Sequence, residues 1–271
     1  MQTSGKKLPG AYGANEPKQN AANLRTKGWE LMLTWNDAFK LANKPFRYNL
    51  SVGLADNTSE ITKFDNPSKI LSDYYVGQKL GDIWGYVVDG LFRTDEEAAN
   101  YNVDQTAVNF VINTAQVNPG LHAGDMKFVD LDGDHTISSG SNTADDPGDR
   151  KIIGNSLPRY TYSIQGGFDW YGFDFSIYLQ GVGHQDWYPG TNSVFFWGPY
   201  ARPYSSFIPR DFLSQVWSPE NPDAYFPRPI GYLALGNNRS LGVVNDRYLQ
   251  NLAYCRVKNI TVGYTLSLIH I

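Results

Sequence analysis

The 271-residue sequence contains one cysteine, Cys255, which excludes an internal disulfide framework and suggests neither a zinc site nor a CxxC redox pair. No uninterrupted apolar run approaches the length that a membrane-spanning helix needs. The formal net charge is −4 and no basic patch or stripe is present, so the composition argues against a nucleic-acid partner. The first residues lack the apolar core of a signal peptide, so we expect the true N-terminus of an exported protein to be missing.

Catalytic signatures are also lacking. None of the four histidines has a triad or metal-motif context, so we predict no catalytic residues and no enzyme activity. What the sequence does have is aromatic content of 14%, with 18 Tyr and 7 Trp, together with 26 Gly and 15 Pro. This composition favours strands, turns and long loops over helices.

The clearest pattern is the stretch 159–183, which predicts a β-hairpin with a tight turn at 170–172. Apolar and polar residues alternate through both strands. The apolar set comprises Tyr160, Tyr162, Ile164, Phe168, Phe173, Phe175, Ile177 and Leu179. Strands of about ten residues with one apolar face and aromatics at the turn are typical of outer-membrane barrels. A soluble β-sandwich also has alternating strands, so this hairpin alone leaves both folds open.

The same alternation recurs elsewhere and gives five strands in total. We therefore predict a loop at 1–25, a barrel hairpin at 26–55, a loop with a short helix and an acidic turn at 56–158, a barrel hairpin at 159–183, an aromatic-rich loop at 184–250 and a barrel strand at 251–265. Residues 266–271 depart from the pattern and are interpreted as a sequencing scar.

Three local features refine this division. The first hairpin should be connected through residues 36–45. A capping box at Thr94 predicts a helix that runs through Asn100. The apolar positions Val257 and Ile260 are an odd number of residues apart, which predicts a β-bulge near Lys258.

The lengths of the connections distinguish the two folds. Links after the first and third strands are short, whereas those after the second and fourth are very long. In an antiparallel sheet this places all short links at one end, as in barrels with short periplasmic turns and long extracellular loops. The predicted fold class is therefore all-β: a fragment of a large antiparallel transmembrane barrel with five strands and two long extracellular loops.

Five segments, in order, carry a family resemblance. They lie at 23–30 (NLRTKGWE), 76–92 (VG, then GY and DGLF), 124–134 (GD, then DLDGD), 152–158 (IIG, then P) and 256–264 (RVKNITVGY). Together they resemble the SusC/RagA family of TonB-dependent outer-membrane transporters. The resemblance implies a barrel of about 22 strands, of which this chain would supply part of the C-terminal third.

The resemblance also implies a function. It implies active import of oligosaccharides or peptides across the outer membrane of a Gram-negative bacterium. A SusD-like surface lipoprotein would be the lid, and the TonB complex would act through N-terminal parts missing here. A soluble carbohydrate-binding β-sandwich and a structural or adhesive outer-membrane barrel are the alternatives.

An acidic turn within the loop 56–158 resembles the start of a calcium loop, in which positions one, three and five supply oxygens and position seven a backbone carbonyl. The predicted ligands are Asp130, Asp132, Asp134, the Thr136 carbonyl and a completing carboxylate, Asp149, from the range 145–149. His135 stands where such loops have glycine, and Ser141 where they have glutamate. The alternative is a solvated acidic turn.

Aromatic residues crowd the loop 184–250. Trp187, Tyr188, Trp197 and Tyr200 are candidates for contact with a ligand or a lid protein. The alternative is that such residues form the loop's own small core. On the polar faces of the strands, the charged side chains expected to line the lumen are Glu30, Arg47, Asp169 and Asp174.

Overall fold

The computed structural model describes residues 2–4, 18–20, 22–108, 120–201, 208–236 and 239–266. For 2–4 and 18–20 it describes the backbone only. No helix in these ranges has the length and apolar character needed to cross a membrane.

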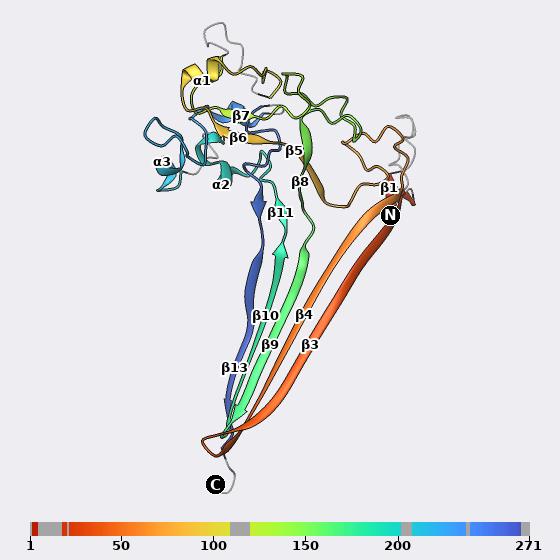
Figure 1. The fold of residues 1–271 in the computed structure, drawn as a ribbon, viewed down its shortest axis with the longest axis vertical. Helices are drawn as coiled ribbons and strands as arrows, with labels where there is room; N and C mark the ends of the chain where they lie inside the picture. Colours follow the sequence, from red (N-terminus) through yellow and green to blue (C-terminus); the bar gives the residue numbers. More distant parts are fainter. Residues whose placement is uncertain are drawn as a thin grey trace, which may run out of the picture.

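Five strands form one antiparallel sheet in the order β13-β10-β9-β4-β3. Their bounds are β3 Asn23–Leu41, β4 Lys44–Lys63, β9 Arg159–Trp170, β10 Phe173–His184 and β13 Tyr254–Tyr264. Both tight turns lie at the lower end of the sheet in Figure 1, and both long connections lie at the upper end. The predicted five-stranded antiparallel sheet is confirmed, although the described residues do not close it into a barrel.

The first hairpin extends beyond its predicted range. The connection predicted over 36–45 shrinks to two residues, Ala42 and Asn43, whose φ angles are 50° and 60°. Tyr171 and Gly172 connect the second hairpin with φ angles of 49° and 85°. Two successive positive φ angles are what a type I′ turn requires, and this turn matches the twist of the paired strands.

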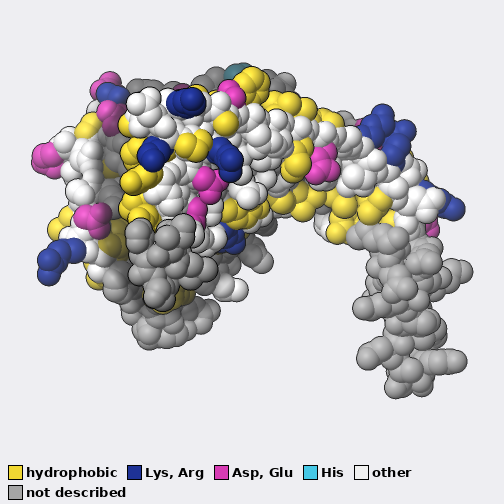
Figure 2. All heavy atoms as spheres, turned by 90° about the horizontal axis from the view of Figure 1, so that it is seen from below, with side chains coloured by type: hydrophobic (Ala, Val, Ile, Leu, Met, Phe, Trp, Pro, Cys, Tyr) yellow, Lys and Arg dark blue, Asp and Glu magenta, His cyan; other side chains and the backbone are white. Residues whose placement is uncertain are grey.

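The two faces of the sheet differ in chemistry. One row across β4, β9, β10 and β13 joins Leu50, Gly166, Ile177 and Ile260, and the next joins Asn49, Gly167, Ser176 and Thr261. Among the described residues nothing covers the apolar face: Trp35 is 62% exposed and Val262 is 70% exposed. Seen from below, hydrophobic side chains extend along the sheet (Figure 2).

The predicted bulge is confirmed at Lys258. Tyr178 pairs with Asn259, but the next residue, Leu179, pairs with Val257, so Lys258 is the extra residue on β13. The bulge keeps Val257 and Ile260 on the same apolar face despite their odd spacing.

The long connections form a second body, which we call the loop unit: the described parts of residues 64–158 and 185–253. Its core contains Phe128, Trp197, Tyr200, Phe226 and Tyr248, all buried. These side chains come from both long connections, so the two connections pack together at the upper end of the sheet (Figure 1).

Short elements build the loop unit. They are β5 Asp82–Tyr86, β6 Val88–Leu91, α1 Asp95–Ala99, β7 Met126–Phe128, β8 Arg150–Asn155, β11 Asp186–Trp187, α2 Val194–Trp197, η2 Gly198–Tyr200, α3 Phe212–Gln215, η3 Tyr232–Leu235 and β12 Gln250–Asn251. The pairs are β5–β8, β6–β7 and β11–β12. The region predicted as loop at 1–25 instead contains β1 Gln2–Ser4 paired with β2 Lys18–Asn20, and the start of β3.

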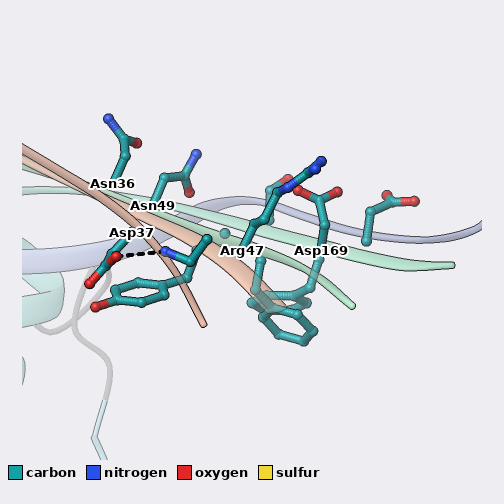
Figure 3. Close-up of a pocket in the computed structure, with 12 residues that line it drawn as sticks. Asn36, Asp37, Arg47, Asn49 and Asp169 are labelled. Carbon is teal, nitrogen blue, oxygen red and sulfur yellow. Dashed lines mark hydrogen bonds between the residues drawn. The ribbon is translucent and has the colours of Figure 1, made fainter. Parts of the chain in front are cut away.

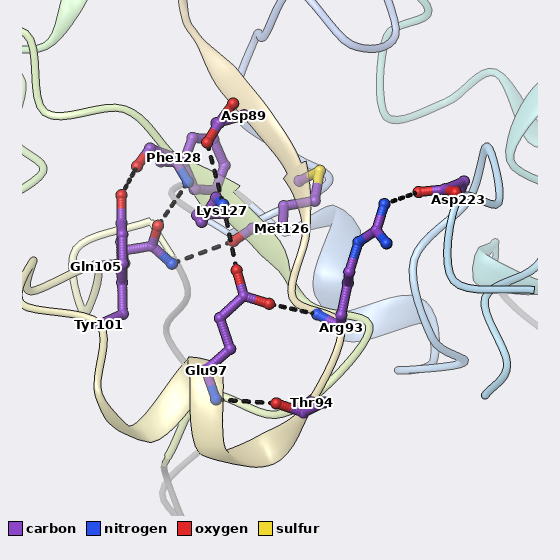
Figure 4. Close-up of polar contacts among 10 residues, drawn as sticks. All are labelled: Asp89, Arg93, Thr94, Glu97, Tyr101, Gln105, Met126, Lys127, Phe128 and Asp223. Atoms are coloured by element: carbon purple, nitrogen blue, oxygen red, sulfur yellow. Dashed lines mark hydrogen bonds and ion pairs between the residues drawn. The ribbon is translucent and has the colours of Figure 1, made fainter.

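The predicted helix is present as α1, with Thr94 as its N-cap. Thr94 Oγ1 accepts a hydrogen bond of 3.1 Å from the backbone N–H of Glu97. Lys127 on β7 reaches Glu97 at 3.3 Å and Asp89 at 3.0 Å, as Figure 4 shows. This ion-pair network joins the helix to the β6–β7 pair.

Candidate functional site

A polar surface covers the face of the sheet opposite the apolar one, near the tight turns. It borders a cavity of about 610 Å³. Its lining includes Asn36, Arg47, Asn49, Asp169, Asp174 and Ser176. Figure 3 shows Asn36, Asn49, Arg47 and Asp169 pointing to one side of the sheet, whereas Asp37 points to the other.

Strand register brings three of the four predicted luminal charges into one row. Arg47 pairs with Asp169, and Asp169 pairs with Asp174 on the next strand. Gly263 continues the row on β13, and a Cβ atom there would collide with the Asp174 carboxylate. Glycine at this position therefore leaves room for the Asp174 carboxylate over the sheet. Glu30 belongs to the polar face of β3, nearer the long connections.

The acidic turn brings together three of its predicted ligands. One carboxylate oxygen from each of Asp130, Asp132 and Asp149 lies within 4.8 Å of the others, and Asp134 is not in this group. Asp149 is buried, and its two oxygens accept hydrogen bonds of 2.7 Å from the backbone N–H groups of Leu131 and Ser138. Asp149 is thereby fixed beneath the two more accessible carboxylates.

The backbone of the turn accommodates the residue that departs from the calcium-loop pattern. His135 adopts a positive φ of 64° at the position where glycine is usual. The pKa of the Asp132 carboxyl is raised: the Asp134 backbone N–H favours the charged form, but desolvation and three neighbouring carboxylates outweigh it. A bound cation would relieve this repulsion.

The aromatic candidates fall into two groups. Trp197 and Tyr200 are 0% and 1% exposed, so the prediction that they contact a ligand or lid is wrong, because they form the core of the loop unit. Tyr188 is half-buried, and its hydroxyl donates to the Val243 carbonyl at 2.9 Å. Burial raises the pKa of the Tyr188 hydroxyl above its usual value. Trp187 is 41% exposed and stays a candidate for outside contact.

The loop unit also contains a cavity of about 450 Å³ that the sequence did not indicate. Its lining residues are Val88, Asp223, Tyr225, Asp246 and Arg247. Val88 comes from the first long connection and the other four from the second. No local motif marks these positions, because only tertiary packing brings them together.

Comparison with curated proteins gives relatives of one kind. Over 96% of its length the chain is 24% identical to TonB-dependent receptor P39 and 24% identical to TonB-dependent receptor P3, both from Formosa agariphila. It is 25% identical over 92% of its length to TonB-dependent receptor SusC from Bacteroides thetaiotaomicron. It covers 26%, 23% and 21% of these proteins, respectively, or about a quarter of their length. No family model matches the chain.

A solved structure shares the fold. The RagAB peptide transporter structure matches with a TM-score of 0.57 and 15% identity, over 96% of this chain and 24% of that one. Because the sequence identity is low, the match supports the fold assignment through the structure itself. The resemblance to SusC/RagA-type TonB-dependent transporters that the five sequence segments indicated is confirmed.

Proposed function

We propose that this chain is part of an outer-membrane TonB-dependent transporter that imports oligosaccharides or peptides. The observation that carries the proposal is the sheet itself. One face is apolar and uncovered, the other is polar with a row of charges, and short and long connections lie at opposite ends. Outer-membrane barrels need these three properties together: a lipid-facing surface, a wet lumen and loops outside the cell.

The two alternatives fit less well. A soluble β-sandwich would cover the apolar face with a second sheet, yet Leu33 and Val262 are 61% and 70% exposed. A structural or adhesive barrel agrees with the sheet, but the matching proteins have receptor or transporter names. The same names support transport rather than catalysis as the activity.

We propose a SusD-like surface lipoprotein as the lid and the TonB complex as the energy source, the latter through parts outside this chain. We also propose that the loop unit lies outside a Gram-negative cell, because the long loops of outer-membrane barrels are extracellular. Trp187, exposed on β11, is the residue we assign to contact with the lid.

Growth of the source bacterium on a single nutrient tests the transport function. Deleting the full-length gene should abolish growth on its nutrient, and deleting tonB should have the same effect. Growth that needs the gene but not tonB would contradict active transport.

Photo-crosslinking tests the lid contact. A photo-crosslinking amino acid in place of Trp187 should capture a surface lipoprotein. Equally strong capture from Tyr171, at the opposite end of the sheet, would contradict the lid contact.

Calcium binding at the acidic turn stays a prediction. The proximity of one carboxylate oxygen from each of Asp130, Asp132 and Asp149 supports these three as its side-chain ligands. Asp134 lies outside this group, and its carboxylate accepts a hydrogen bond of 2.7 Å from the Thr136 backbone N–H. The candidate carboxylates Asp145 and Asp146 have other partners, Lys69 and Ser141.

A further inference from the structure

The apolar face of the sheet ends in a charged boundary at the upper part of β3 and β4. Trp29 and Leu31 lie on this face of β3 and are 49% and 47% exposed. Side chains alternate along a strand, so the next two positions on the same face are Lys27 and Arg25. Arg25 pairs with Glu60 on β4. The face therefore changes from apolar to charged within two residues, or about 7 Å along the strand.

A third basic side chain joins this boundary from the segment that follows β4. Lys79 forms an antiparallel bridge with Glu60, which places the two side chains on the same side of the sheet. The Glu60 carboxylate is attracted by Arg25, Lys27 and Lys79 alike. We call these four residues the rim cluster.

The rim cluster keeps two positive charges after its internal pairing, because it combines three cations with one carboxylate. Arg25 Nη2 lies 2.8 Å from Glu60 Oε2, so the charges of this pair offset each other. Lys27 and Lys79 are both exposed, and among the residues that the structure describes neither forms an ion pair. The two ammonium groups are therefore accessible to an anion from outside.

The other acidic side chain at this boundary is already neutralised. Asp56 lies opposite Trp29, and Arg159 donates two hydrogen bonds of 2.6 Å to its carboxylate. β9 begins at Arg159, so only the first hairpin extends as far as the rim cluster. The upper ends of β3 and β4 also lie apart from the helices of the loop unit (Figure 1). The rim cluster is thus a discrete basic site beside an apolar surface.

We propose that the rim cluster binds the phosphate groups of anionic lipid headgroups. Anionic lipids attract basic side chains at the membrane surface, and tryptophan is typical of the same interface. Lys27 and Lys79 bind the phosphate groups, while Trp29 and Leu31 contact the acyl chains below them. A free phosphate ion would use the lysines alone, so the adjoining apolar surface favours a lipid. The inference rests on the membrane placement of the sheet and goes beyond transport of a nutrient.

Lipid binding to the full-length parent protein in detergent tests this site. The probe is fluorescently labelled diphosphoryl lipid A in mixed micelles, compared with the same lipid after removal of both phosphate groups. We expect the parent to bind the phosphorylated form more tightly. Lys27→Ala and Lys79→Ala should each weaken that binding by about fivefold, the contribution typical of one basic side chain at an anionic lipid surface. Binding should also weaken as the salt concentration rises.

The matched control is Lys151→Ala, which removes an exposed lysine of β8, outside the five-stranded sheet. It should bind lipid like the parent. Heat-modifiable migration on gels reports barrel assembly of each variant. Lys79 lies outside the strands of the sheet, so Lys79→Ala serves if Lys27→Ala does not assemble.

Three results would overturn the proposal. They are affinities of both rim variants equal to that of Lys151→Ala, equally tight binding of the dephosphorylated lipid, and binding of inorganic phosphate as tight as that of the lipid. None of these results bears on growth that depends on tonB, so the lipid site can fail while the transport function stands.

Discussion

The loop unit buries a core of large aromatic side chains, whereas the five-stranded sheet turns its aromatic side chains outward. Trp197 and Tyr248 are 0% exposed in the loop unit. Trp35 and Tyr264, on the sheet, are 62% and 54% exposed. The sequence of the sheet alternates apolar and polar residues, and the sequence of the loop unit clusters apolar ones. Only the loop unit packs its apolar residues into a core.

The difference reflects two solvents. The loop unit has the ordinary core of a protein in water, where apolar burial stabilises the fold. The sheet instead presents an apolar band to its surroundings and ends in aromatic rows: Phe46 stacks on Phe168 at 5.4 Å, and Phe168 on Phe175 at the same distance. Such rows are typical of the membrane interface. The comparison leads to four predictions, given from the largest expected effect to the smallest.

The chain expressed alone should fail to give a soluble monomer. Its outer strands β3 and β13 expose unpaired backbone groups, and the apolar face has no lipid to cover it. Size-exclusion chromatography without detergent should show aggregates only. A monodisperse monomer that unfolds cooperatively would contradict the membrane assignment of the sheet.

Trp197→Ala, made in the full-length parent, should destabilise the loop unit by about 3–5 kcal/mol, because it empties the centre of a packed core. Limited proteolysis in increasing urea should detect earlier cleavage of the loops, while the sheet keeps its protection. The control is Trp187→Ala, which truncates a 41% exposed side chain and should cost less than about 1 kcal/mol. Similar costs for both would refute the assignment of Trp197 to the core.

Ile177→Arg should impair assembly of the parent barrel, because arginine at the bilayer midplane costs about 2–4 kcal/mol. Ser176→Arg, on the neighbouring residue, should be much milder because it points to the polar face. Folding into lipid vesicles, followed by urea titration, measures both. Equal effects at positions 176 and 177 would contradict the assigned faces of β10.

Calcium should stabilise the loop unit only. For a site with a dissociation constant of about 0.1 mM, 1 mM calcium would add about 1.4 kcal/mol. Calorimetric titration of the parent beside an Asp132→Ala variant measures the binding itself. The same heat signal from both proteins, or none from the parent, would mean that the acidic turn is solvated and binds no calcium.

Sequence reasoning was sufficient where local patterns determine the structure. Alternation predicted the sheet and its faces, an odd spacing predicted the bulge at Lys258, and Thr94 with Glu97 predicted α1. It was insufficient for the first turn, where Asn36 and Pro45 suggested an interruption. Asn36 instead lies on the polar face, and Pro45 pairs with Lys40 beside the turn, so neither ends its strand.

Contacts between distant segments could not be predicted from local sequence patterns. Trp197 and Tyr200 are aromatic residues in a loop, and nothing local distinguishes a core residue from a ligand contact. Their burial depends on partners such as Phe128 and Tyr248, which lie in other parts of the chain. The cavity lined by Tyr225 and Asp246 was missed for the same reason, since Val88, which also lines it, comes from the first long connection.

The short turns of the two hairpins have a consequence for the rate of folding. Each of the two hairpins closes across a two-residue turn, so its contacts are local and its loop-closure entropy is small. The Val88 backbone N–H, in contrast, finds Asp246 across 158 positions of the chain. Low contact order favours rapid formation. The hairpins should therefore be complete before the two long connections meet, and folding of the loop unit should be the slow phase.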